Sequence, residues 1–195
     1  MVPVESERRE QILDAAERLF RHYGPGKTTM AEIAREARVG VGSVYLEFAG
    51  KEAILVELSR RRHGVVLTAM RAAASEGAPS ERLLRVFRAR AEGFLRQADD
   101  GAHALELLAC RGCASVRAVH DGFRAEERAI VAEILAAGAA AGELAVGDPE
   151  GLARTVLQAF ALFTAPWVHG LDRAALPAEL ERLHRLVVHG LARRG

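Results

Sequence analysis

The sequence predicts an all-α protein in which a small N-terminal three-helix domain precedes a larger helical bundle. Apolar residues recur at the spacing of one helical face along most of the 195 residues, and aromatic residues make up only 5% of them. No segment shows the alternation that is typical of a half-buried strand. We therefore expect the three-helix domain at residues 1–53 and the bundle at residues 54–195.

The first helix is expected to run from about Glu5 to Tyr23, with Ser6 as its N-cap. Its apolar residues lie on one face, which should pack against the segment that follows. Gly24-Pro25-Gly26 ends the helix, because glycine and proline interrupt helical backbone.

The stretch from Thr28 to Glu52 predicts two short helices joined by a tight turn. Thr29 and Glu32 have the spacing of a capping box, so a helix begins directly after Thr29. Its apolar pattern breaks at residues 38–40, and a second short helix follows from Val41. Three residues are too few for an extended loop. The two helices should therefore cross steeply as a helix-turn-helix.

The second short helix has small residues where a stable helix would have good helix formers. The residues expected to point outward are Gly40, Val41, Gly42, Ser43 and Tyr45. Glycine costs about 1 kcal/mol relative to alanine inside a helix, so helix propensity does not explain this choice. Small residues at a helix start allow its backbone to approach a phosphate or a groove floor. A plain helical hairpin is the alternative interpretation.

The remaining residues predict six further helices. They are expected at residues 51–75, 79–98, 102–111, 115–141, 149–169 and 177–193. Asp148 should cap the helix that begins at Pro149. Arg60, Arg61 and Arg62 are expected to form a solvated charged face, with phosphate contact as the alternative.

The helix-turn-helix stretch resembles the N-terminal domain of the TetR family of bacterial transcriptional regulators. The matching residues are Thr28-Thr29, Ile33-Ala34, Ala37, Val39, Gly42-Ser43-Val44-Tyr45, Phe48 and Lys51-Glu52. The resemblance implies a DNA-binding regulator that is not an enzyme. It further implies a repressor that binds a palindromic operator as a homodimer and that a small, largely apolar effector releases.

The resemblance assigns DNA contacts residue by residue. Hydroxyl and ammonium donors suit phosphate, which gives Thr28, Thr29, Tyr45 and Lys51 as the expected phosphate contacts. Residues at the base edges are expected to be Val41, Gly42 and Ser43. The turn residues Arg38 and Gly40 complete the candidate surface, where Arg38 either adds a contact or only solvates the turn.

Three residues depart from the family pattern, and the first is Gly40, which stands where a serine often caps the second helix. Arg38 stands where the turn usually has glycine, and a left-handed arginine there costs roughly 1 kcal/mol. Glu47 stands where the family commonly has a side chain suited to phosphate. A carboxylate at that position repels DNA unless it points away or pairs with Arg38. With a net charge of +1 for the whole chain, any positive DNA-facing field must be local.

The last two predicted helices have apolar stripes that a monomer leaves uncovered. These stripes include Leu152, Val156, Ala159, Phe160 and Phe163, then Leu180, Leu183, Leu186, Val187 and Leu191. A second copy would bury them in a four-helix bundle, which the resemblance also implies. A homodimer would place two DNA-binding domains about 34–36 Å apart, the spacing of successive major grooves.

A small, largely apolar effector is expected among the helices of the bundle. The candidate lining residues are Met70, Phe87, Phe94, His103, Leu107, Cys110, Phe123 and Trp167. Ordinary core packing is the alternative for each of them.

Two other functions are compatible with the sequence. His103, Cys110, Cys113 and His120 cluster along the chain, which would suit a helical metal- or redox-sensing protein. Buried cysteine is also a common small apolar residue, so we expect no metal and no cofactor. A helical adaptor that does not bind DNA is the third possibility. The N-terminus lacks the apolar core of a signal peptide and no run is long enough to span a bilayer, so we expect a cytoplasmic protein without a membrane partner.

Overall fold

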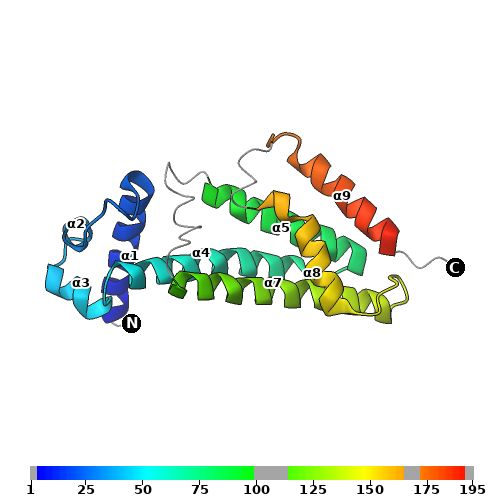
Figure 1. Cartoon of the computed structure of the whole chain (residues 1–195), viewed down its shortest axis with the longest axis horizontal. Coiled ribbons are helices and arrows are strands. Elements are labelled where there is room, and N and C mark those ends of the chain that lie inside the picture. Colours follow the sequence, from blue (N-terminus) through cyan, green and yellow to red (C-terminus); the bar gives the residue numbers. More distant parts are fainter. Residues whose placement is uncertain (1–3, 99–113, 165–171, 192–195) are drawn as a thin grey trace. The chain divides into compact units, whose positions relative to one another are not determined.

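The computed structural model describes residues 4–98, 114–164 and 172–191, and helices dominate all three ranges (Figure 1). The helices are α1 (Val4–Tyr23), α2 (Met30–Glu36), α3 (Val41–Glu47), α4 (Lys51–Ala73), α5 (Pro79–Ala98), α7 (Ala114–Ala140), α8 (Pro149–Ala159), the 3-10 helix η1 (Ala161–Phe163) and α9 (Leu176–Leu191). The described ranges contain no strand ladder, and the predicted all-α class is confirmed. The helix predicted at residues 102–111 lies outside them.

Most helix boundaries agree with the sequence patterns, and two do not. α1 begins at Val4, so Ser6 lies inside the helix and is not its N-cap. α8 ends at Ala159, although its apolar pattern predicted continuation to residue 169. Phe160 leaves the α-helical conformation at φ −88° and ψ 11°, and η1 follows directly.

The chain divides into two compact units, and the division falls inside α4 between Arg62 and His63. The first unit comprises Met1–Arg62 with Ala98–Asp121, and the second comprises His63–Gln97 with Gly122–Gly195. The domain boundary expected after residue 53 stays a prediction. In the first unit, α1, α2, α3 and the first turns of α4 share one apolar core that includes Ile12, Phe20, Ile33, Ala34, Val44, Phe48, Ile54 and Leu58.

Ion pairs join α4 to α1 inside the first unit. Arg62 Nη2 lies 3.0 Å from Glu17 Oε1, and Arg61 Nη1 lies 2.5 Å from Asp14 Oδ1. The solvated face predicted for the arginine trio is wrong for Arg62, which is buried, and holds for the exposed Arg60. The spacing of residues along α4 could not predict that carboxylates of α1 pair with Arg61 and Arg62.

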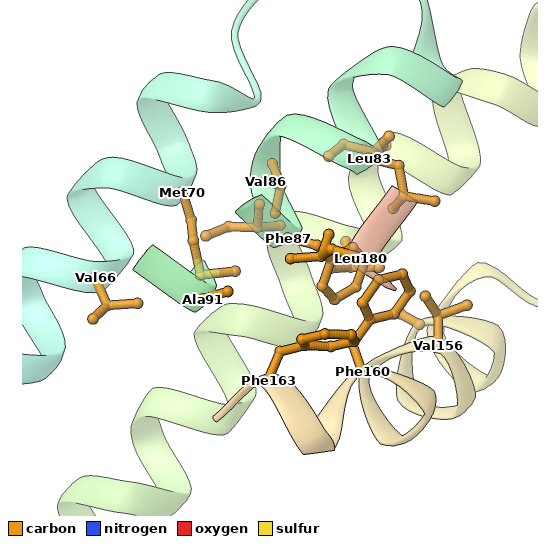
Figure 2. Close-up of a cluster of buried hydrophobic side chains, with 14 of the residues drawn as sticks. Val66, Met70, Leu83, Val86, Phe87, Ala91, Val156, Phe160, Phe163 and Leu180 are labelled. Atoms are coloured by element: carbon orange, nitrogen blue, oxygen red, sulfur yellow. The ribbon is translucent and has the colours of Figure 1, made fainter. Parts of the chain in front are cut away.

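Aromatic rings pack together in the core of the second unit (Figure 2). The rings of Phe87 and Phe160 stack with centroids 3.8 Å apart and an interplanar angle of 11°. Phe163 lies beside Phe160 at 5.9 Å, also between ring centroids. This packing holds Phe160 in the core, where the backbone of α8 departs from α-helical geometry.

A buried ion pair crosses the same unit. Arg90 of α5 donates hydrogen bonds to both carboxylate oxygens of Glu127 of α7, and both side chains are buried. Arg90 also donates to the backbone carbonyl of Phe160, with a distance of 3.5 Å between Nη1 and the oxygen. One guanidinium therefore joins α5, α7 and the end of α8.

Within the described ranges, no helix combines the length and the apolar character that crossing a membrane would need.

Candidate DNA-binding surface

The capping box predicted at the start of α2 is present. The Thr29 hydroxyl accepts a hydrogen bond from the Glu32 backbone N–H at 3.2 Å, and Glu32 Oε2 accepts one from the Thr29 N–H at 2.8 Å. The backbone hydrogen bond from Thr29, followed by the bond from its hydroxyl, lowers the pKa of Glu32 below its usual value of 4.5. The box therefore fixes the residue at which α2 begins.

Arg38 has the left-handed conformation that the short turn required. Its φ is +57°, and it is the one non-glycine residue with positive φ in the described part of the chain. The next N–H, from Val39, bonds back to the carbonyl of Ala34 at 3.0 Å. This hydrogen bond closes the end of α2 and directs the chain into α3.

Replacing Arg38 with glycine should raise the free energy of unfolding by about 1 kcal/mol, because glycine adopts positive φ without a Cβ clash. Urea unfolding followed by circular dichroism measures the change. Arg35→Gly is the matched control, since the exposed Arg35 lies inside α2 and glycine there should cost about 1 kcal/mol. A loss of stability in Arg38→Gly would contradict the argument.

α3 buries one side and exposes the side that sequence reasoning selected. Val44 is fully buried, whereas Val41 and Tyr45 are exposed, Tyr45 at 54%. Sequence reasoning missed Leu46, which is 82% exposed and therefore the most exposed large apolar side chain of α3. Its spacing of four residues from Gly42 on a helix could have indicated it.

The two glycines at the start of α3 are not required by packing within this chain. A Cβ at Gly42 would meet no heavy atom within 4 Å, and one at Gly40 would meet only the Ser43 hydroxyl at 3.9 Å. Neither residue has positive φ. Their small size leaves open space on the outward side of the helix.

Thr28 and Lys51 lie differently from the other candidates. The buried Thr28 hydroxyl donates a hydrogen bond to the Gly24 carbonyl at 3.0 Å, so its side chain fastens the loop before α2. This corrects the expectation that the Thr28 hydroxyl faces phosphate. The Lys51 ammonium donates to the Thr28 carbonyl at 2.9 Å, which fixes the start of α4 beside the same loop. An ammonium has three N–H donors, and this bond uses one.

Glu47 points away from the outward side of α3. Its Oε1 accepts hydrogen bonds from Arg8 Nη2 at 2.6 Å and Arg8 Nε at 2.9 Å, and the carboxylate side chain is 14% exposed. The partner is thus an arginine of α1, and the pairing with Arg38 considered from the sequence does not occur.

Half of the candidate effector residues can be placed. Met70, Phe87, Phe94 and Phe123 all belong to the apolar core of the second unit. His103, Leu107, Cys110 and Trp167 lie outside the described residues, as does Cys113. Among the residues that the structure does describe, no three His, Cys, Asp or Glu side chains gather as a metal site.

Family models match both parts of the chain. Residues 12–58 match the model of bacterial regulatory proteins of the tetR family, and residues 79–184 match the tetracyclin repressor-like C-terminal domain. The chain belongs to the TetR family. Members of this family regulate transcription and are not enzymes, and the family fold implies DNA binding and dimerisation.

Relatives of this TetR-family chain are regulators as well. The HTH-type transcriptional regulator HbdR of Aromatoleum sp. (strain CIB) is 49% identical over 49 residues, which cover 25% of this chain and 21% of HbdR. The curated relatives are matched over only about a quarter of their own length, between 21% and 28%.

Solved structures extend the similarity over nearly the whole chain. A candidate transcriptional regulator from Pseudomonas aeruginosa PAO1 superimposes with a TM-score of 0.76 at 25% identity, over 95% of this chain and 90% of that one. The regulator FadR from Bacillus subtilis, solved in complex with stearoyl-CoA, superimposes with a TM-score of 0.72 at 24% identity, over 93% and 98% of the two chains. At 24% identity the second comparison shows the fold alone.

Proposed function

We propose that this TetR-family regulator is a repressor that binds a palindromic operator as a homodimer and leaves it when a small, largely apolar effector binds. The outward side of α3 is the observation that carries the DNA-binding part. It combines an exposed tyrosine, an exposed valine and two glycines that the packing of the chain does not require. Such a surface allows close approach of the helix to a groove.

The proposed contacts divide by chemistry. Tyr45 and Lys51 offer a hydroxyl and an ammonium donor to phosphates, and Arg38 at the exposed turn offers a guanidinium. The Thr29 hydroxyl donates to Glu32 Oε2 at 2.8 Å, so a phosphate contact by Thr29 would replace that hydrogen bond. Base-edge contacts are assigned to Val41, Gly42 and Ser43, with Gly40 leaving room for the backbone at the helix start. Apolar contact by Val41 would favour a thymine methyl, so direct sequence readout should be modest.

Replacing Tyr45 with alanine should weaken operator binding by roughly 10-fold to 100-fold, because each operator-bound copy loses a hydrogen bond to a charged phosphate. The measurement is fluorescence anisotropy with a DNA fragment from the region upstream of the coding sequence. The operator within that fragment is located first by footprinting.

Tyr23→Ala is the matched control for this test. Tyr23 of α1 is 53% exposed, against 54% for Tyr45, so the two substitutions remove similar exposed surface. The control should bind within about twofold of the wild type, because Tyr23→Ala removes no proposed phosphate contact. A twofold change in affinity corresponds to only about 0.4 kcal/mol. Unchanged binding by Tyr45→Ala, with both variants folded, would contradict the assigned surface.

The expectation that a monomer leaves the stripes of the last two helices uncovered is wrong for four of their residues, which are buried in the core of the same chain: Val156, Phe160, Phe163 and Leu180. Homodimerisation through these helices is supported by two other apolar side chains. Leu162 of η1 and Leu186 of α9 are exposed, although both belong to helices with an otherwise buried apolar side. Exposed leucines on the last elements of a TetR fold suit a symmetric contact with a second copy.

The effector proposal rests on the apolar core of the second unit. Four of its candidate residues contribute to one cluster of aromatic and aliphatic side chains that a lipophilic molecule could enter by displacing them. FadR from Bacillus subtilis was solved with stearoyl-CoA, so this compound belongs in a panel of lipophilic probes. An effector should reduce operator affinity by roughly 5-fold to 150-fold in the same anisotropy assay.

A metal- or redox-sensing function would depend on the cluster of His103, Cys110, Cys113 and His120. Of these four residues, only His120 lies within the described ranges. A helical adaptor that does not bind DNA would account for the acidic Glu47 and for the net charge of only +1. The pairing of Glu47 with Arg8 removes the first of these reasons.

A further inference from the structure

We infer that Arg8 and Arg9 of α1 hold the C-terminal end of α3 through Glu47, and that Glu47 thereby strengthens sequence-specific DNA binding. This inference rests on the proposed role of α3 in DNA binding. It assigns a positioning role to Arg8, Arg9 and Glu47.

The first contact joins side chains that are 39 residues apart. Arg8 donates from Nη2 and Nε to the same carboxylate oxygen of Glu47, at 2.6 Å and 2.9 Å. The pair is partly shielded, with the arginine 33% and the glutamate 14% exposed. Shielding from water strengthens a charge-assisted pair relative to one on an open surface.

The second contact acts on the backbone of the same residue. Arg9 Nη1 donates to the Glu47 carbonyl at 3.1 Å, and Glu47 is the last residue of α3. Carbonyls in the last turn of a helix have no partner within the helix, and a cation there is favoured by the helix dipole. The Arg9 guanidinium lies 4.3 Å over the Phe48 ring, and its Nη2 lies 3.2 Å from Glu57 of α4. Arg9 therefore joins α1, α3 and α4 at one point.

The C-terminal end of α3 is where restraint has the most effect. α3 has seven residues, its N-cap Gly40 makes no side-chain capping bond, and Val44 is its one buried residue. A helix of this length is about 10 Å long, so a tilt of about 10° at one end moves the other end by about 2 Å. A shift of 2 Å is enough to lose hydrogen bonds at base edges.

This arrangement predicts that DNA binding weakens when the acidic Glu47 on the DNA-binding helix is neutralised. A carboxylate that faces DNA repels it, and its neutralisation would strengthen binding to any sequence. A carboxylate that holds the helix through Arg8 has the opposite effect, because its neutralisation releases the helix and weakens the contacts that distinguish sequences.

The test compares Glu47→Gln with the wild-type dimer on two DNAs of equal length, the footprinted operator and a random sequence. Anisotropy titrations are made at a temperature where circular dichroism shows every variant folded. We expect operator affinity to fall about tenfold, the equivalent of weakening one base contact per site, while random-sequence affinity changes less than about twofold. A ratio of operator to random affinity that falls about tenfold supports the inference.

Glu36→Gln is the matched control. Glu36 lies on α2 of the same unit and pairs with Arg18 at 2.9 Å in an exposed ion pair, so the charge change is identical. Its affinity ratio should stay unchanged. Arg8→Gln should reproduce the loss seen in Glu47→Gln, and the double variant should be no worse than either single variant, because one pair is being removed.

Three results would overturn the inference. Tighter binding of Glu47→Gln to both DNAs would identify a repelling charge, an equal loss on both would identify a general structural role, and additive losses in the double variant would mean that Arg8 and Glu47 act separately. If wild-type protein shows no preference for any upstream site, the proposed function fails instead.

Discussion

Replacing Leu186 with glutamate should convert the proposed dimer into a monomer and remove operator binding. Leu186 is 72% exposed on α9, and the proposed interface would bury it in both copies. A central apolar contact contributes about 2 kcal/mol to the free energy of dimerisation, and a two-fold symmetric dimer contains this contact twice. The loss of about 4 kcal/mol should raise the dissociation constant of the dimer by roughly 1000-fold. Each monomer would then offer one helix-turn-helix, which cannot contact both halves of a palindrome. Sedimentation velocity measures the first effect and anisotropy the second.

Val65→Glu is the control for this prediction. Val65 is an exposed aliphatic residue of α4 in the same unit, so the substitution adds the same charge away from α9. The control should remain dimeric and should bind operator as the wild type does. A Leu186→Glu variant that still sediments as a dimer would exclude this surface from the interface.

Replacing Glu127 with glutamine should lower the free energy of unfolding by about 3 kcal/mol, because the substitution leaves the buried Arg90 guanidinium without its counter-charge. For a chain of this size that loss corresponds to a fall in Tm of roughly 6–12 °C. The van der Waals volume of the side chain barely changes, so the effect would report charge compensation and not packing. Thermal and urea unfolding of the purified variant measure it.

The neighbouring residue provides a matched control on the same helix. Glu126 pairs with Arg71, and both side chains are about half exposed, so Glu126→Gln should cost less than about 1 kcal/mol. Replacing both members of the buried pair, as in Arg90→Met with Glu127→Leu, should recover most of the lost stability. Equal losses for the Glu126 and Glu127 variants would show that burial does not matter at this pair.

The surface on α3 could be found from the sequence because its signals are local. Gly40 to Tyr45 form one short run, in which Val41 and Tyr45, four residues apart, are exposed and Val44 is buried. Leu46 was missed, although it lies four residues after the outward Gly42 and therefore on the same side of the helix.

Sequence alone determined where α2 and α8 begin and what the turn between α2 and α3 requires. The capping box of Thr29 and Glu32 and the N-cap Asp148, whose Oδ1 accepts from the Gly151 N–H at 3.0 Å, are hydrogen bonds between residues three apart. The left-handed Arg38 follows from the length of a turn. Such features depend only on residues close together in the chain, so a short stretch of sequence is enough to predict them.

Tertiary structure alone decided which charges are paired. Glu47 bonds to Arg8 across 39 residues, and Arg62 bonds to Glu17 across 45. The stacking of Phe160 on Phe87 likewise accompanies the early end of α8. A charged or aromatic side chain is stabilised by whichever partner the folded chain brings into contact with it. That partner is distant in the sequence, so the residues next to the side chain do not identify it.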